Sequence, residues 1–216
     1  LLSQSNRIRY VIRNSKFKKH KNLYMNILVI SGSPRDNANS LNVANYCCDH
    51  LNKIEQVEAQ VLDINNCGLE AWSFSATTNE ATQSLIEQAD GYIFAVPEWH
   101  GMVPPGFKNL FFYFNALFAH KPAYIIGVSS GSGGRYPITE LRSTTYKNSF
   151  INYIPISTVL DHVEDVINTD AEYIADTDFM AQRLDEGMQF LVSYTQALSA
   201  VRESEIFKEK RFKNGL

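Results

Sequence analysis

The chain has 216 residues, of which 44% are apolar and 20% are charged, and its formal net charge is −3. This length and composition are typical of a folded protein with one sizeable core. No apolar run approaches the roughly 18 residues that a membrane-spanning helix needs, which argues against an integral membrane protein.

Positive charge is concentrated at the N-terminus. Residues 1–24 contain seven Lys and Arg residues and no acid, and removing these seven charges from the net charge of −3 leaves −10 for the remainder. An acidic body argues against a nucleic-acid partner. Because Met25 directly precedes the first predicted strand, we expect a basic leader over 1–24 outside the native fold and one domain over 25–216. A targeting segment or a nucleic-acid arm is the alternative interpretation of the leader.

The three cysteines, Cys47, Cys48 and Cys67, are odd in number, and two of them are adjacent. Their spacing fits neither a disulfide framework nor a metal site. We therefore expect small core-filling residues in a protein of the reducing cytoplasm.

The first predicted strand covers residues 27–30, a short β-branched run without charge that is typical of a strand buried on both faces. Gly32 and Pro34 end it. Asn39 and Ser40 are favourable N-cap residues, and a helical pattern follows at Leu41, Ala44, Cys48 and Leu51.

A strand, a small polar loop and a helix N-terminus in this order favour an anion site, because the free N–H groups of the helix point at the loop. Ser33 and Ser40 add hydroxyl donors, and Arg35 adds a bidentate cation suited to phosphate. The alternative is an ordinary strand-to-helix turn whose Ser and Arg side chains face water.

Strands and helices alternate along the rest of the chain. Further strands are predicted over 57–64, 92–96, 124–128 and 151–160, helices over 80–88, 105–118 and 138–146, and a long C-terminal helix with Leu184, Met188, Leu191, Thr195 and Leu198 on one face. This alternation predicts a three-layer α/β sandwich around a doubly wound, five-stranded parallel sheet of order 2-1-3-4-5. An acidic segment precedes the last helix; we expect a solvated loop there, the alternative being a metal site, and its acids are Asp161, Glu164, Asp165, Asp170, Glu172, Asp176 and Asp178.

Ligands of such sheets bind beyond the carboxyl ends of the strands. The loops after the first, third and fourth strands are the richest in Gly, Ser and Pro, and the latter two cover 97–105 and 129–135. We expect the three loops to form one pocket. A phosphate cradle, an aromatic loop and a glycine loop together suit a flat heteroaromatic nucleotide.

These motifs together resemble the NADPH-dependent FMN reductase family of the flavodoxin-like fold. Gly-Ser-Pro-Arg at 32–35 is similar to the family's FMN phosphate loop, Pro-Glu-Trp-His-Gly at 97–101 to its Pro-Glu-Tyr-Asn loop beside the isoalloxazine, and 105–109 and 130–135 to its next helix start and its glycine loop. The resemblance covers about 26–156. It implies FMN contacts from Ser33, Arg35, Asn39, Ser40, Leu41, Pro97, Glu98, Trp99, His100, Gly101, Ser130, Gly131, Gly133 and Gly134.

The chain departs from the family pattern at three positions. Trp99 replaces the usual Tyr, which keeps an aromatic wall, and His100 replaces the usual Asn, which places a group that can titrate near neutral pH close to the flavin edge. His100 is therefore a candidate for proton transfer, with a structural role as the alternative. Phe112 stands where the family often has Asp, and its apolar face suggests a subunit interface. Resemblance implies a homodimer or a dimer of dimers.

The resemblance also implies the reaction. FMN is the cofactor and NADPH or NADH the co-substrate, and hydride passes through flavin N5 to a small acceptor: a quinone, flavin, azo compound, nitroaromatic or metal oxyanion. No protein nucleophile is needed, and no metal is expected. Backbone N–H groups of 98–101 and 130–134 are the expected donors to the N1 and carbonyl edge of the ring.

Two other functions compete with this one. A flavodoxin-like electron carrier would bind FMN without nicotinamide turnover, but Arg35 and the 97–101 loop favour the reductase. A regulatory module that has lost flavin is the second. Classical dinucleotide and P-loop motifs are absent after the first strand.

Overall fold

Five parallel strands organise the computed structural model, which describes residues 24–173 and 178–209. The strand order is β2-β1-β3-β4-β5, as predicted. The strands are β1 (Met25–Ser31), β2 (Val57–Asp63), β3 (Gly91–Pro97), β4 (Pro122–Val128) and β5 (Asn152–Leu160). Every pairing in the sheet is parallel, so the carboxyl ends of all five strands lie at one edge.

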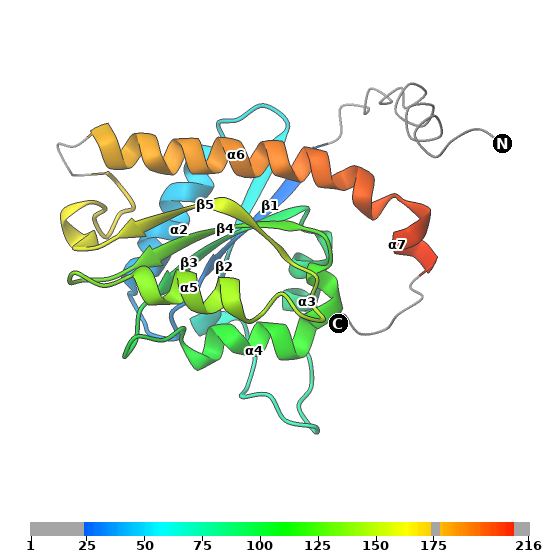
Figure 1. Cartoon of the computed structure of the whole chain (residues 1–216). Coiled ribbons are helices and arrows are strands. Elements are labelled where there is room, and N and C mark those ends of the chain that lie inside the picture. The colour runs from blue at the N-terminus through cyan, green and yellow to red at the C-terminus, as the bar shows by residue number, and fades with distance from the viewer. Residues whose placement is uncertain (1–23, 174–177, 210–216) are drawn as a thin grey trace.

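Helices cover both faces of the sheet (Figure 1). On one face lie α2 (Asn39–Leu51) and α6 (Asp178–Arg202); on the other lie α3 (Glu80–Gln88), α4 (Pro105–Phe114) and α5 (Arg135–Ser143). Short elements complete the described chain: η1 (Ile64–Asn66), η2 (Asn115–Phe118), η3 (Val163–Asp165) and α7 (Glu205–Glu209). This is the three-layer, flavodoxin-like α/β sandwich that the alternation predicts.

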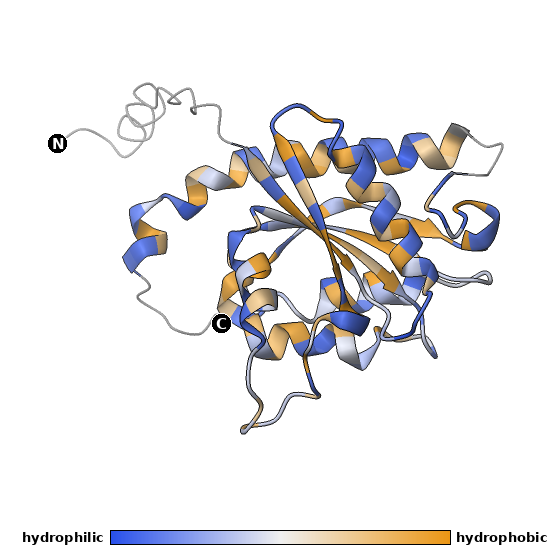
Figure 2. Cartoon of the chain, turned by 180° about the vertical axis from the view of Figure 1, so that it is seen from behind, coloured by the Kyte–Doolittle hydropathy of each residue, from blue (hydrophilic) through white to orange (hydrophobic). Residues whose placement is uncertain are grey.

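Two hydrophobic cores result from the alternation of side chains along the strands. Ile27 and Val29 of β1 pack with α2 and α6, whereas Leu28 and Ile30 pack with α3, α4 and α5. The central strands β1, β3 and β4 are mostly hydrophobic along their length, whereas the edge strand β2 and the helix α6 alternate between hydrophilic and hydrophobic residues (Figure 2). This distinction is expected because helices cover both faces of the sheet, whereas each helix packs against the sheet by one face and exposes the other to water.

The predicted face of the C-terminal helix is confirmed at Leu184, Met188, Leu191 and Thr195 of α6, which are buried, whereas Leu198 is half-buried. Phe107, Leu110, Phe114 and Phe118 of α4 and η2 are also buried against the sheet. The cysteines are free thiols with Cys47 and Cys67 buried, so they fill the core as expected. Within the described part of the chain, no helix has both the length and the apolar character to cross a membrane.

Several predicted helix ends are wrong. The N-cap of α2 is Ala38, which has no side-chain cap hydrogen bond, and not Asn39 or Ser40. The regular helix α4 ends at Phe114, and the chain reaches Phe118 as the 3₁₀ turn η2. The predicted helix 138–146 is shifted: α5 covers Arg135–Ser143 because Gly134, with a φ of 97°, serves as its N-cap. The predicted leader lies outside the described residues, apart from Tyr24.

Candidate functional site

The loops after β1, β3 and β4 meet in one pocket of about 250 Å³ at the carboxyl edge of the sheet. Predicted site residues that line it are Ser33, Arg35, Asn39, Ser40, Pro97, Glu98, Trp99, Ser130 and Gly131, and Ala38, Val128 and Ser129 complete the lining. Leu41, His100, Gly101, Gly133 and Gly134 do not line the pocket. Parallel topology thus brings three loops that are distant in sequence to one place.

The loop after β1 provides hydrogen-bond donors for an anion. The Ser33 side chain is buried, and its Oγ accepts a hydrogen bond from the Arg35 amide at 3.3 Å. Ser40 is also buried, with its Oγ 3.3 Å from Ser31 Oγ. α2 begins beside this loop, where a helix start leaves its first amides without intrahelical acceptors, and the Leu41 amide is the first that donates to the Ala38 carbonyl oxygen, at 2.8 Å. A phosphate group fits these amides and the exposed Arg35 guanidinium.

The loop after β3 forms a tight two-residue turn. Trp99 and Met102 exchange both backbone hydrogen bonds, at 3.0 and 2.8 Å. Between them His100 and Gly101 have φ values of 51° and 73°, as both central residues of a type I′ turn require. His tolerates this left-handed region better than most residues do. The backbone geometry therefore supplies a structural reason for His100, whose side chain is exposed.

Trp99 forms an aromatic wall of the pocket. The Arg35 guanidinium carbon lies 5.0 Å from the centroid of its ring, within the range of a cation–π contact. The indole Nε1 is buried and has no hydrogen-bond partner among the described residues. A buried donor without an acceptor costs about 1–3 kcal/mol. An acceptor atom on a bound ligand would remove this cost, so the site fits a ring that carries carbonyl or phosphate oxygens.

Glu98 connects the loops after β3 and β4. Its Oε2 accepts hydrogen bonds from the amides of Gly134 at 2.6 Å and Tyr136 at 3.2 Å, at the start of α5. A Cβ on Gly133 would lie 3.1 Å from Glu98 Oε1. Glu98 thereby acts on α5 as a capping carboxylate from another loop, a placement that favours the helix start electrostatically.

Glu140 holds the other end of the same turn. Its carboxylate accepts from Lys108 Nζ and from the Val103 amide, both at 2.7 Å. Burial alone would raise the pKa of Glu140, but these two hydrogen bonds and the charge of Lys108 outweigh it, so the pKa is lowered. Glu98 and Glu140 thus fasten both ends of the 98–103 segment to α5.

Sequence reasoning missed a fourth loop at the site, the one after β5. Glu164 in η3 accepts hydrogen bonds from Asn39 and Ser130, and Asp161 lies 3.5 Å from Arg135. The position of these acids in the sequence could have predicted this loop, because they directly follow a strand whose carboxyl end lies at the edge of the sheet that carries the site. Within residues 24–173 and 178–209, no three His, Cys, Asp or Glu side chains are grouped in a way that could hold a metal ion.

Comparison with known proteins agrees with this geometry. The family model described as NADPH-dependent FMN reductase matches residues 25–164. A curated relative, the NADPH azoreductase of Bacillus sp. (strain OY1-2), is 30% identical over 149 residues, which cover 65% of this chain and 80% of the relative.

Solved structures share the fold at low identity. An oxidoreductase from Corynebacterium diphtheriae has a TM-score of 0.63 at 13% identity, covering 82% of this chain and 99% of that one. A flavoenzyme NAD(P)H:(acceptor) oxidoreductase from Paracoccus denitrificans has a TM-score of 0.61 at 18% identity, covering 82% and 98%. The family match, which spans all three loops of the pocket, decides the assignment: the chain belongs to the NADPH-dependent FMN reductase family and is an NAD(P)H-dependent FMN oxidoreductase.

Proposed function

We propose that the pocket binds FMN with the phosphate at the start of α2 and the ring between the 97–101 turn and the loop after β4. The observation that carries this proposal is the convergence of Ser33, Trp99 and Gly131 on one pocket. The buried hydroxyls of Ser33 and Ser40, the exposed Arg35 guanidinium and the Trp99 ring beneath it all belong to this pocket. A phosphorylated aromatic ring is the ligand that uses hydroxyl donors, a guanidinium and an aromatic wall together.

When bound, FMN supplies the hydride chemistry, so the chain's own residues need only bind and orient. Arg35 can pair with the phosphate, and Trp99 can pack against the ring system. Gly131 has no atom within 4 Å of the position where a Cβ would stand, which leaves open space beside the pocket. This open space is the side from which we expect a nicotinamide and then an acceptor to approach.

Among small acceptors we propose azo compounds first, with quinones, free flavin, nitroaromatics and metal oxyanions as the other candidates. The support is the curated relative, which is named an NADPH azoreductase and is 30% identical to this chain over 80% of its own length. An open ring face accepts flat conjugated molecules without dedicated side chains, so we expect a broad acceptor range.

The test is an absorbance spectrum of the purified protein followed by anaerobic addition of NADPH or NADH and then an acceptor panel. We expect a bound flavin that NADPH or NADH bleaches rapidly and that an azo dye reoxidises. Slow bleaching with a bound flavin would favour an electron carrier. Colourless protein that takes up no FMN would overturn the proposal.

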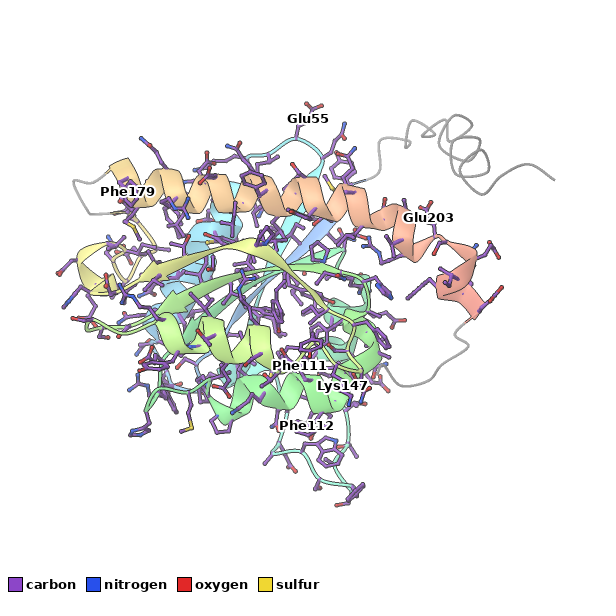
Figure 3. All side chains as sticks on the ribbon, viewed as in Figure 1. Glu55, Phe111, Phe112, Lys147, Phe179 and Glu203 are labelled. Atoms are coloured by element: carbon purple, nitrogen blue, oxygen red, sulfur yellow. The ribbon has the colours of Figure 1, made fainter. Side chains whose placement is uncertain are left out.

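We also propose that the protein is a homodimer whose subunits pair through α4. We propose the cytoplasm as its location. Phe112 is 62% exposed, and its ring centroid lies 5.5 Å from that of Trp72, which in turn lies 5.1 Å from that of the exposed Phe74. A groove of about 510 Å³ adjoins this cluster, with Phe111, Phe112 and Lys147 in its lining (Figure 3). Exposed aromatic clusters of this kind mark interaction surfaces.

Light scattering after size exclusion tests the dimer. Phe112→Glu should convert it to a monomer, whereas Phe179→Glu, which changes an equally exposed phenylalanine at the far end of the molecule, should not (Figure 3). A wild-type monomer, or a Phe112→Glu dimer, would contradict the proposal.

A further inference from the structure

Three side chains from three loops meet beside the pocket. Glu164 Oε1 accepts a hydrogen bond from Asn39 Nδ2 at 2.8 Å and one from Ser130 Oγ at 3.2 Å. Asn39 Nδ2 also lies 3.2 Å from Ser130 Oγ, which closes a triangle. Asn39 and Ser130 line the pocket, and Glu164 stands behind them.

This triangle is the hydrogen-bonded connection between two sides of the pocket. Asn39 follows β1 and Ser130 follows β4, and β3 separates these two strands in the sheet. Among the described residues, the one direct hydrogen bond between the loops 32–41 and 129–135 is that between Asn39 and Ser130. The spacing of the two loops therefore depends on how these side chains are held.

Glu164 is itself presented from a fixed frame. The amides of His162 and Val163 donate to the carbonyl oxygens of Gly131 and Ser129, each at 3.0 Å. The Val163 side chain is fully buried. The short turn η3 is thus fastened to the loop after β4 by its backbone, and the adjacent Glu164 carboxylate reaches back to Asn39.

We propose that Glu164 is a positioning residue for FMN, which sets the spacing between the phosphate loop and the glycine loop. An ionised carboxylate only accepts hydrogen bonds, so the Ser130 hydroxyl and the Asn39 amide both turn hydrogens toward it. Their own role is then to hold the pocket, while the backbone amides and Arg35 remain for the phosphate. This inference rests on the proposed FMN site, and it adds a residue outside the pocket lining.

The experiment measures the FMN dissociation constant by quenching of flavin fluorescence for the wild type, Glu164→Ala, Glu164→Gln and Asp165→Ala. Losing both accepted bonds in Glu164→Ala should weaken FMN binding about tenfold, given the usual strength of such bonds. Gln keeps an acceptor oxygen and should stay within about threefold of the wild type. Asp165→Ala removes one negative charge from the same turn without touching the triangle, so it is the matched control and should bind as the wild type does.

A double-mutant cycle completes the test, because substitutions of two residues in one hydrogen-bond network have non-additive effects on binding. Asn39→Ala combined with Glu164→Ala should bind FMN no more weakly than the weaker single variant. Unchanged binding in Glu164→Ala, or equal losses in Ala, Gln and the Asp165 control, would overturn the positioning role while wild-type FMN binding left the proposed function standing. A wild-type protein that binds no FMN would overturn both.

Discussion

The carboxylate of Glu98 accepts a hydrogen bond from the amide of Gly134 at 2.6 Å, and this contact joins the turn after β3 to the N-cap residue of α5. Glu98→Ala leaves that amide and the amide of Tyr136 without an acceptor. We expect a loss of about 2 kcal/mol in the free energy of unfolding, within the range for hydrogen bonds to charged groups. Glu98→Gln keeps an acceptor and should lose about half as much. Urea denaturation measures both values, and an Ala variant with wild-type stability would show that the contact contributes nothing.

Gly127 of β4 packs tightly against the backbone of Gly134, the residue before α5, behind the glycine loop. A Cβ on Gly127 would stand 1.8 Å from the carbonyl oxygen of Gly134, which is backbone and cannot turn away. Gly127→Ala should destabilise the fold by about 3 kcal/mol through overpacking.

Gly131→Ala is the control for this prediction, since nothing lies within 4 Å of its Cβ position. It should change stability by less than about 0.5 kcal/mol. Thermal unfolding of the two variants compares them directly. Equal unfolding temperatures would mean that the backbone at Gly127 relaxes more easily than its packing indicates.

The Arg35 guanidinium is exposed, so it is free to pair with a phosphate, and it also lies 5.0 Å from the centroid of the Trp99 ring. Arg35→Ala should weaken FMN binding by about tenfold or more, because charge-assisted hydrogen bonds contribute about 1.5–3 kcal/mol. Riboflavin lacks the phosphate, so its affinity should change much less. Arg135→Ala removes an exposed arginine outside the pocket lining and should leave both affinities unchanged. Unchanged FMN affinity in Arg35→Ala would exclude the phosphate role.

His100 occupies a position that its backbone conformation explains, with a φ of 51°. Asn is favourable in this left-handed region, so His100→Asn should retain bound FMN and change turnover modestly at most. His100→Val should destabilise the protein by about 1–2 kcal/mol, because a β-branched side chain fits this region poorly. Stopped-flow reduction by NADPH separates the roles: loss of hydride transfer in the Asn variant with FMN still bound would assign His100 to catalysis.

The sequence predicts the sheet order and the convergence of the three loops because both follow from local patterns. Buried parallel strands are short apolar runs, and their order fixes which loops meet. The ends of α2 and α5 are different, since they depend on distant partners. Asn39 looks like an N-cap in isolation, yet its side chain is engaged by Glu164, 125 residues away. Likewise α5 begins early because Glu98, 36 residues before Gly134, holds its first turn. Such contacts leave no periodic signal in the sequence.

A buried lysine at the opposite edge of the sheet gives the protein a pH dependence of stability. Lys121 Nζ donates to the carbonyl oxygens of Ile86 and Glu87 at 3.0 and 2.8 Å, near the C-terminal end of α3. Burial, and next repulsion from Arg202, lowers the pKa of Lys121 to about 8 in the folded protein. The unfolded chain keeps a lysine pKa of about 10.4.

Between pH 8 and about 10.4 the unfolded chain therefore binds more protons at this residue than the folded protein does, so stability rises with pH there. The cost of the charged Lys121 is fully present below pH 8 and disappears as pH rises through the unfolded pKa. Raised pKa values of the buried cysteines and tyrosines act in the opposite direction at high pH, because the unfolded chain releases those protons first. A comparison with Lys121→Met tests the lysine, since the groups that do not touch it cancel between the two proteins. Tyr92, whose hydroxyl accepts from Lys121 Nζ at 3.3 Å, keeps its proton over this range in the folded protein because burial raises its pKa.

The free energy of unfolding of the wild type minus that of Lys121→Met should rise by up to about 3 kcal/mol from pH 8 to 10.4 and stay constant below pH 8. Lys53→Met removes a positive charge from an exposed lysine outside both cavities, so it is the matched control and should show no such rise. Urea titrations at four pH values measure both series. A flat difference for Lys121→Met would mean that the two carbonyl oxygens stabilise the ammonium as well as water does, and that burial leaves its charge unaffected.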